Sequence, residues 1–155
     1  MGTLDVDSAE RLALRELVER YAQSVDARDV DGVTHLFTED GAMLSHLFPG
    51  TEETPYERVG HTKIHRALEL GLAQYLATTH MIGAHVVELD GAEGDGVVVC
   101  MAHHVYDDPE GAGRRLLVMA IRYEDRYAKE HGMWRFAERR LRLLWREDRP
   151  LADGR

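Results

Sequence analysis

The hydrophobic periodicity of this chain changes at His80, and that change limits the folds that the chain can adopt. Before His80, apolar residues recur every three or four positions over 8–27, 27–38 and 61–79, which predicts three helices. After His80, β-rich runs alternate with the turn sequences DGAEGDG, DPEGAGR and HGM, which predicts long antiparallel strands joined by hairpins. Because helices and strands are segregated along the chain, we expect an α+β fold whose sheet curls around the helices and leaves a cavity at one end.

The stretch between the second and third helical segments is less regular. Residues 42–48 predict a first strand, and residues 49–60 predict a loop because proline and glycine punctuate both ends. The 155 residues contain no repeat and no linker-like segment, so we expect one domain that spans 1–155.

Charge and composition disfavour several classes of protein. The formal net charge of −9 argues against a nucleic-acid or membrane-surface partner, because such partners are bound by basic patches. No apolar run approaches the roughly 18 residues that cross a bilayer, and the acidic start lacks the features of a secretory signal. The single cysteine, Cys100, excludes an intramolecular disulfide and suits a reducing compartment, so we expect a cytoplasmic protein.

Asp26 follows directly on the apolar stripe of the first helix, and an aspartate is seldom fully buried without a partner. His80, at the start of the first long strand, is a candidate partner. A buried carboxylate can fix the tautomer of an imidazole, so that the other ring nitrogen acts as a general base. Tyr21, five residues before Asp26, could donate a hydrogen bond to a substrate oxygen. A purely structural interpretation also exists, with Asp26 as a helix end, His80 as a strand end and Tyr21 as core.

Other side chains on the strands are candidates for lining a pocket. His103 and His104 are adjacent on a strand and point to opposite faces, so one of them faces the interior, and the sequence leaves open which. Arg140 shares a face with Trp134 if the last strand is regular, and there it could bind an anion or stabilise developing negative charge. A solvated strand face on which Arg140 pairs with Glu138 explains the same pattern equally well.

Metal and nucleotide motifs are weak. His61 and His65 are one helical turn apart, but HTKIH lacks the glutamate of the zinc-protease motif, so we expect no metal site. GAEGDG joins two strands and opens no helix, so it does not fit the dinucleotide fingerprint. Cys100 lies in an apolar strand without an evident activator, which indicates an inert core thiol.

The order of these motifs resembles a known family. A helix carries Tyr21 and Asp26, and it is followed by the segments DVDGVTHLFTEDGAM, TTHMIGAHVVELDG and RYEDRYAKEHGMWRFAERRLRLLW. Over about residues 8–147, this order resembles the SnoaL-like branch of the nuclear-transport-factor-two-like superfamily. The resemblance implies a cone-shaped α+β barrel, in which a curved mixed or antiparallel sheet encloses a deep apolar pocket. This scaffold hosts dehydratases, isomerases, polyketide cyclases, dehydrochlorinases and noncatalytic subunits, so the reaction does not follow from the fold.

One subgroup contains scytalone dehydratase, bile-acid dehydratase and hexachlorocyclohexane dehydrochlorinase. Its enzymes pair an aspartate late in the first helix with a histidine at the start of a strand. The resemblance therefore implies that Asp26 and His80 form this dyad, and Tyr21 stands where the bile-acid enzyme has a tyrosine. Arg140 falls where the dehydrochlorinase has an active-site arginine.

His103 or His104 lies near the second histidine of scytalone dehydratase. From the resemblance we expect a cofactor-independent lyase or isomerase, with dehydration as the favoured reaction, in which His80 removes a C–H proton. The substrate would be a small apolar molecule such as a polyketide, terpenoid or steroid. The alternatives are a polyketide cyclase that uses the same dyad and a noncatalytic ligand-binding or assembly module. Sheets of this family often pair through their outer faces, so we expect a homodimer or homotrimer.

Overall fold

The computed structural model describes residues 6–51, 53–111 and 113–152. In chain order, its elements are α1 (Val6–Asp26), α2 (Val30–His35), β1 (Phe37–His46), β2 (Tyr56–Val59), α3 (His61–Leu72), β3 (Ala77–Asp90), β4 (Glu93–Asp107), β5 (Arg114–Glu130) and β6 (Met133–Pro150). The six strands form one sheet in the order β2-β1-β6-β5-β4-β3. Neighbouring strands are antiparallel except β1 and β6, which are parallel.

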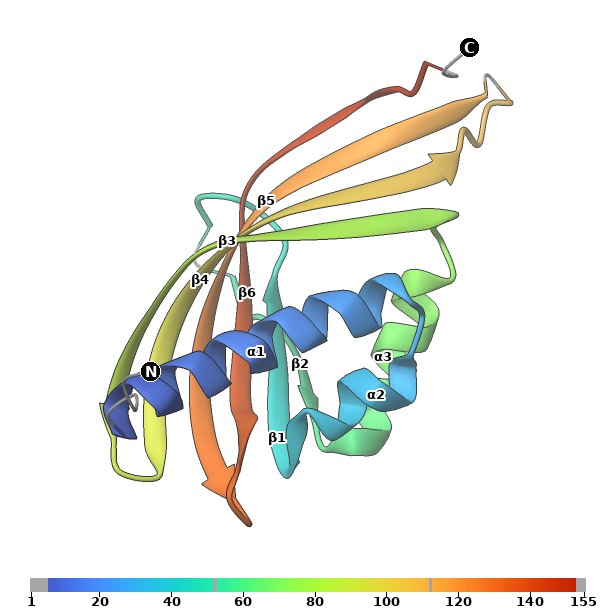
Figure 1. Ribbon diagram of the computed structural model, residues 1–155. Coiled ribbons are helices and arrows are strands. Elements are labelled where there is room, and N and C mark those ends of the chain that lie inside the picture. The colour runs from blue at the N-terminus through green and yellow to red at the C-terminus, as the bar shows by residue number, and fades with distance from the viewer. Residues whose placement is uncertain (1–5, 52, 112, 153–155) are drawn as a thin grey trace.

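The α+β prediction is confirmed, and so is the curved, mixed sheet. The sheet does not close into a barrel, however, because β2 and β3 remain as its two edges. Helix α1 crosses the concave face, α2 and α3 lie together at one end of it, and the ends of the long strands project beyond the helices (Figure 1). Within the described ranges, no helix is long and apolar enough to cross a membrane.

Three boundaries differ from the sequence prediction. Strand β1 begins already at Phe37, which the helical period had assigned to the second helix, because Phe37 pairs with Phe136 of β6 and is buried. The expected loop 49–60 contains the short strand β2, which pairs with β1. Helix α3 ends at Leu72, and the following chain enters the sheet, where the Leu76 amide donates to the Val105 carbonyl at 2.7 Å. In the first and third places strand pairing overrides the local helical pattern, and in the second it orders part of an expected loop.

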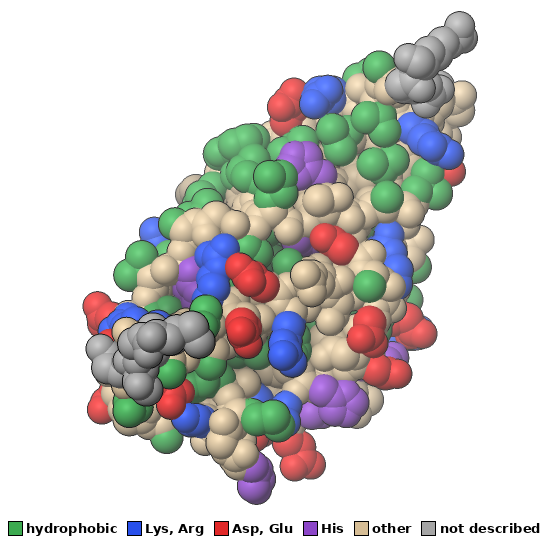
Figure 2. Space-filling model, in the orientation of Figure 1, with side chains coloured by type: hydrophobic (Ala, Val, Ile, Leu, Met, Phe, Trp, Pro, Cys, Tyr) green, Lys and Arg blue, Asp and Glu red, His purple; other side chains and the backbone are tan. Residues whose placement is uncertain are grey.

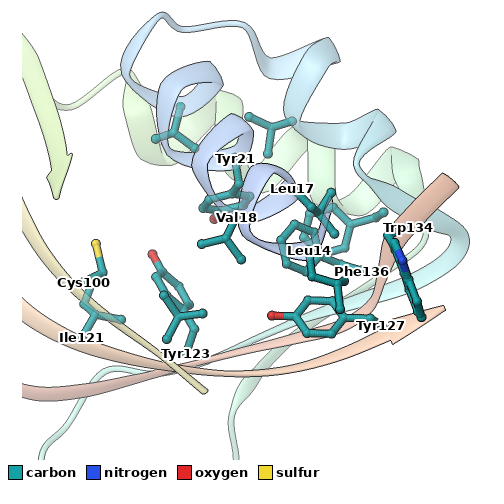
Figure 3. Packing of buried hydrophobic residues seen from close by; sticks show 14 of the residues in the cluster. Leu14, Leu17, Val18, Tyr21, Cys100, Ile121, Tyr123, Tyr127, Trp134 and Phe136 are labelled. Atoms are coloured by element: carbon teal, nitrogen blue, oxygen red, sulfur yellow. The ribbon is translucent and has the colours of Figure 1, made fainter. Parts of the chain in front are cut away.

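The core lies between α1 and the concave face of the sheet. The apolar stripe of α1 comprises Leu14, Leu17, Val18, Tyr21 and Val25, all of them buried. Figure 3 shows this stripe facing aromatic side chains that rise from β5 and β6. Because the stripe and the inner face of the sheet are both apolar, their contact fixes the angle at which α1 crosses the strands.

A buried ion pair lies within this aromatic core. The Arg139 guanidinium is 0% exposed and lies 3.1 Å (Nε to Oδ1) from Asp125, and its Nη2 donates to Oδ2 at 3.2 Å. Its Cζ lies 4.2 Å from the ring centre of Tyr21 and 3.8 Å from that of Tyr123. The aromatic faces therefore share with Asp125 the stabilisation of a charge that water cannot reach.

An irregularity in β6 decides which of its arginines faces the core. Phe136 pairs with Tyr127, whereas Glu138 pairs with Arg126, so one residue of β6 is left without a partner between them. A bulge of this kind reverses the alternation of the side chains that follow it. Arg139 therefore faces the core, whereas in a regular strand Arg140 would face it together with Phe136.

Candidate active site

Asp26 and His80 lie in contact, although 54 positions separate them. The ring Nδ1 of His80 donates to Oδ1 of Asp26 at 2.7 Å, and the backbone N–H of His80 donates to Oδ2 at 2.8 Å. The Thr78 hydroxyl adds a third hydrogen bond, to Oδ1, at 2.9 Å. Three donors therefore fix the carboxylate, and the carboxylate fixes the orientation of the imidazole.

The end of α1 places this carboxylate at the start of β3. The helix ends at Asp26, and Arg28 has a positive φ of 63°, so the chain turns sharply away from the helix axis. The Arg28 guanidinium donates to the Tyr75 carbonyl at 2.8 Å, which ties this turn to the segment that leads into β3. The contact between α1 and β3 therefore does not depend on the dyad alone.

His80 is held as a neutral base. Its side chain is 8% exposed, and burial lowers the pKa of the imidazole below its ordinary value, although the hydrogen bond and the charge of Asp26 act in the opposite direction. With Nδ1–H bonded to Asp26, the second ring nitrogen, Nε2, carries the lone pair. No described residue forms a hydrogen bond with Nε2. The geometry thus leaves one basic nitrogen available for a proton from another molecule.

A second histidine lies beside the dyad. His104 is buried, and the centre of its ring lies 5.6 Å from that of His80 and 4.5 Å from that of Tyr75. Burial, and secondarily the neighbouring His80, lower the pKa of His104 to about 4, so this imidazole is neutral near pH 7. A neutral imidazole can donate a hydrogen bond from one nitrogen to an oxygen that gains negative charge.

Apolar side chains extend the concave face around these histidines. Across the strands His80 pairs with Ala102 and Ala102 with Met119, while His104 pairs with Leu117, so all of these side chains share one face. Figure 2 shows hydrophobic side chains gathered over the projecting ends of the long strands, with a histidine among them. The deep pocket that the family resemblance implies stays a prediction.

The other predicted site residues lie in different surroundings. Tyr21 is 5% exposed and stacks edge-on against Phe37, Tyr123 and Phe136. Burial raises the pKa of its hydroxyl, which therefore stays protonated. It lies about 140° around the helix from Asp26, since each helical residue turns the chain by about 100°. Its contact with a substrate stays a prediction.

His103 and Arg140 point away from the concave face. His103 alternates with His104 along β4, so its ring lies on the outer face of the sheet, which resolves the alternative that the sequence left open. Arg140 also lies outside, where it pairs with Glu138 at 3.0 Å and approaches Nε2 of His46 at 3.3 Å. The bulge in β6 therefore gives Arg140 the position of the alternative interpretation, on the outer face beside Glu138, and its contact with a substrate stays a prediction.

Two contacts of the site were not predicted. Thr78 and His80 share a face because they are two positions apart on β3, but the predicted helix over 61–79 includes Thr78, so the sequence pattern did not indicate this contact. Tyr75 was assigned to a helix, and its ring contact with His104 depends on where that helix ends. Only the tertiary structure shows these two contacts.

Histidines outside the site have protein partners of their own. His61 Nε2 lies 3.0 Å from the Phe37 carbonyl oxygen, and His65 Nε2 lies 3.0 Å from the Asp31 carboxylate. The part of the chain that the structure describes contains no group of His, Cys, Asp and Glu suited to a metal ion. Cys100 is buried in the core, and burial raises the pKa of its thiol to about 11.

The fold and the site together define a class of protein: an α+β domain in which a carboxylate at the end of the first helix pairs with a histidine on the concave face of a curved sheet. The family model of the SnoaL-like domain matches residues 6–140. The chain belongs to this family, as its motifs predicted.

Proteins similar to this chain include a relative in sequence and several solved structures. An uncharacterised protein of Mycobacterium tuberculosis is 24% identical over 131 residues, which cover 84% of this chain and 83% of that protein. A Novosphingobium aromaticivorans protein, named provisionally as a scytalone dehydratase, is 20% identical with a TM-score of 0.77, over 96% of this chain and 93% of that one. A hexachlorocyclohexane dehydrochlorinase from Novosphingobium barchaimii is 15% identical with a TM-score of 0.73, over 90% of each chain. At these identities the two structural likenesses establish the fold alone.

Proposed function

We propose that this protein is an enzyme of the lyase or isomerase type, in which His80 removes a C–H proton from a small apolar substrate. The observation that carries the proposal is the 2.7 Å hydrogen bond from Nδ1 of His80 to a carboxylate that three donors hold in place. This arrangement orients Nε2 and stabilises the imidazolium that forms when the proton arrives.

For a β-hydroxy ketone, the reaction would be a dehydration. Nε2 of His80 takes the proton on the carbon next to the carbonyl, and the electron pair of the broken C–H bond forms the new C=C bond. The C–O bond to the hydroxyl breaks, and the hydroxyl leaves as water with the proton that the His80 imidazolium returns. Substrate and protein atoms balance, since His80 ends in its starting form and Asp26 keeps its charge throughout.

His104 would assist by binding the substrate carbonyl. As the C–H bond breaks, negative charge builds up on the carbonyl oxygen, and the neutral His104 ring beside His80 can donate a hydrogen bond to it. The apolar surroundings strengthen this hydrogen bond, because its electrostatic part grows as water is excluded. They also favour a substrate that is itself largely apolar.

The structural relatives support this class of reaction without fixing the substrate. One is named provisionally as a scytalone dehydratase and another as a dehydrochlorinase, and both names describe eliminations. An isomerase, or a cyclase that closes a ring by an aldol step, would begin with the same proton abstraction. The product therefore distinguishes these reactions, whereas the dyad serves all of them.

The first step can be tested without knowledge of the natural substrate. The protein would be incubated in D2O with a panel of apolar ketones that carry a β-hydroxyl or β-chloro group, and nuclear magnetic resonance would follow deuterium uptake next to the carbonyl and loss of the leaving group. We expect one or more compounds to react with the wild type and not with His80→Ala. Reaction at equal rates with both proteins would overturn the assignment of His80 as the base.

A further inference from the structure

A groove of 710 Å³ runs between the outer side of α3 and strands β1 and β2. Its size falls in the range of sites that hold small molecules. Met43 and Leu47 lie along the β1 side of the groove, and Tyr56 and Arg58 contribute from β2. The dyad residues are not among those that line it, so the groove is a separate feature of the fold.

Helix α3 presents two different stripes. Ile64, Leu68 and Leu72 pack into the core or against it. The groove is lined by the other stripe, whose members recur at helical spacing: Lys63, Arg66, Ala67, Leu70, Gly71 and Gln74. Leu70 is 53% exposed there, although a large apolar side chain gains little by facing water. The second stripe is therefore suited to contact with something other than the protein core.

The charge of the groove differs from that of the whole protein. The chain carries a net charge of −9, yet the described residues that line this groove include three cations, Arg58, Lys63 and Arg66, and no carboxylate. Arg66 pairs with Glu69 at 2.9 Å in an exposed position, and such a pair is weak and easily exchanged for another anion. Arg58 lies over the Tyr56 ring at 5.8 Å, which holds its guanidinium beside the groove.

Along α3 the charged side chains of the groove precede the apolar ones, whereas on the sheet side Met43 lies opposite Arg58. Lys63 and Arg66 belong to the first half of α3, whereas Leu70 and Gly71 belong to its second half. A Cβ atom added at Gly71 would meet no heavy atom within 4 Å beyond the neighbouring residues and backbone of the helix, so this end of the groove is open space beside α3. A molecule that bound here would place a negative group near the start of α3 and an apolar body near its end.

We propose that this groove is a binding site for amphipathic anions, that is, molecules with a carboxylate, sulfate or phosphate group on an apolar body. Arg58 and Lys63, together with Arg66 once it exchanges its weak exposed pair with Glu69 for the ligand, provide the affinity for the anionic group. The apolar floor of Met43, Leu47 and Leu70 provides the affinity for the body. Binding here requires neither Asp26 nor His80, so it does not depend on the catalytic role proposed for them.

The test compares octanoate with 1-octanol, which share a chain length and differ in charge. Each would be titrated into 15N-labelled protein, and the amide shifts give both the place of binding and the affinity. We expect octanoate to shift signals of α3 and β2 and to bind at least about tenfold more tightly than 1-octanol. Equal affinities, or octanoate shifts elsewhere only, would overturn the proposal.

Substitutions at Gly71 provide a matched pair. Gly71→Leu fills the open end of the groove and should weaken octanoate binding about tenfold or more, whereas Gly71→Ala adds a single carbon and should change it less than about twofold. Both replacements favour the helix over glycine, so neither should unfold α3. Unchanged binding by Gly71→Leu would contradict the site.

Removal of two cations tests the binding of the anionic group separately from the binding of the apolar body. The double variant Arg58→Gln/Lys63→Gln should weaken octanoate about tenfold or more and leave 1-octanol unchanged. Asp26→Asn should bind octanoate as the wild type does, because the dyad lies outside the groove. If Asp26→Asn lost binding while Gly71→Leu kept it, octanoate would be occupying the dyad site, and the groove proposal would be wrong.

Discussion

Asp26 accepts hydrogen bonds from both the ring Nδ1 and the backbone N–H of His80, so one carboxylate fixes the side chain and the strand start that carries it. This double contact couples the end of α1 to the edge strand β3. A substitution at Asp26 therefore changes the hydrogen bonds of both the His80 imidazole and the His80 backbone N–H.

Asp26→Asn is expected to lower kcat by about 10²–10⁴, because an amide can hold the ring but stabilises its protonated form poorly. The rate would be measured on whichever ketone reacts in the deuterium experiment. Asp90→Asn, an exposed aspartate at the end of β3, is the matched control and should keep full activity. Full activity of Asp26→Asn would contradict the dyad.

The adjacent histidines allow a comparison within one strand. His104→Ala should reduce kcat by about 10–10³, because the developing oxyanion loses a hydrogen-bond donor. His103→Ala removes the same side chain from the outer face and should change the rate less than about twofold. The two rates, measured beside the thermal stability of each variant, decide whether only the inward histidine takes part. Equal losses would point to a general effect on β4.

The rate should depend on pH through His80. Burial lowers the pKa of His80 below its ordinary value of 6.5, and only the neutral ring can accept a proton. kcat/KM should therefore be constant near neutral pH and fall as the pH drops through the lowered pKa, with the midpoint below 6.5. A profile of kcat/KM against pH between 4 and 9 would show this limb. A midpoint above 7 would contradict a buried, neutral base.

Arg139→Met should destabilise the protein strongly, because it leaves Asp125 buried without its cation. The loss of one partner of a buried pair costs about 3–5 kcal/mol. Burial already raises the pKa of Asp125 from 3.8 to about 6, so this carboxyl binds a proton more readily in the folded than in the unfolded protein. Its contribution to stability is present at low pH and is lost as the pH rises through the folded pKa.

Without Arg139 that pKa rises further, so the penalty should be larger at pH 8 than at pH 5. Urea unfolding at both pH values measures the difference. The double variant Arg139→Met/Asp125→Asn should recover part of the loss, since no buried charge remains. An equal penalty at both pH values would contradict the role of Asp125 ionisation.

Tyr21→Phe tests whether this hydroxyl takes part in the reaction. The ring packs against three aromatic side chains and lies 4.2 Å from the Arg139 guanidinium, and phenylalanine keeps these contacts. We expect the variant to unfold at nearly the wild-type temperature and to keep kcat within about tenfold. A loss of more than about a hundredfold at unchanged stability would support the predicted role of Tyr21 as a donor to the substrate.

Much of the fold could be predicted because it depends on local patterns. The apolar stripe of α1, the turn sequences between the long strands and the change of period at His80 are all readable along the chain. The predicted boundaries differ from the structure where strand pairing competes with helical spacing, as at Phe37, which pairs with Phe136 of β6. The parallel contact between β1 and β6 has no local signal, since it joins residues about 100 positions apart.

The sequence by itself determined the residue types that can perform acid–base chemistry, and the family resemblance indicated that Asp26 and His80 would meet. Only the tertiary structure decided which side chains accompany them. Strand alternation is strict, but its phase depends on register, so the choice between His103 and His104 needed the pairing of β4 with its neighbours. The single unpaired residue between Phe136 and Glu138 moved Arg139 into the core and Arg140 out of it. A bulge depends on contacts between distant strands, which is why the local pattern of β6 could not reveal it.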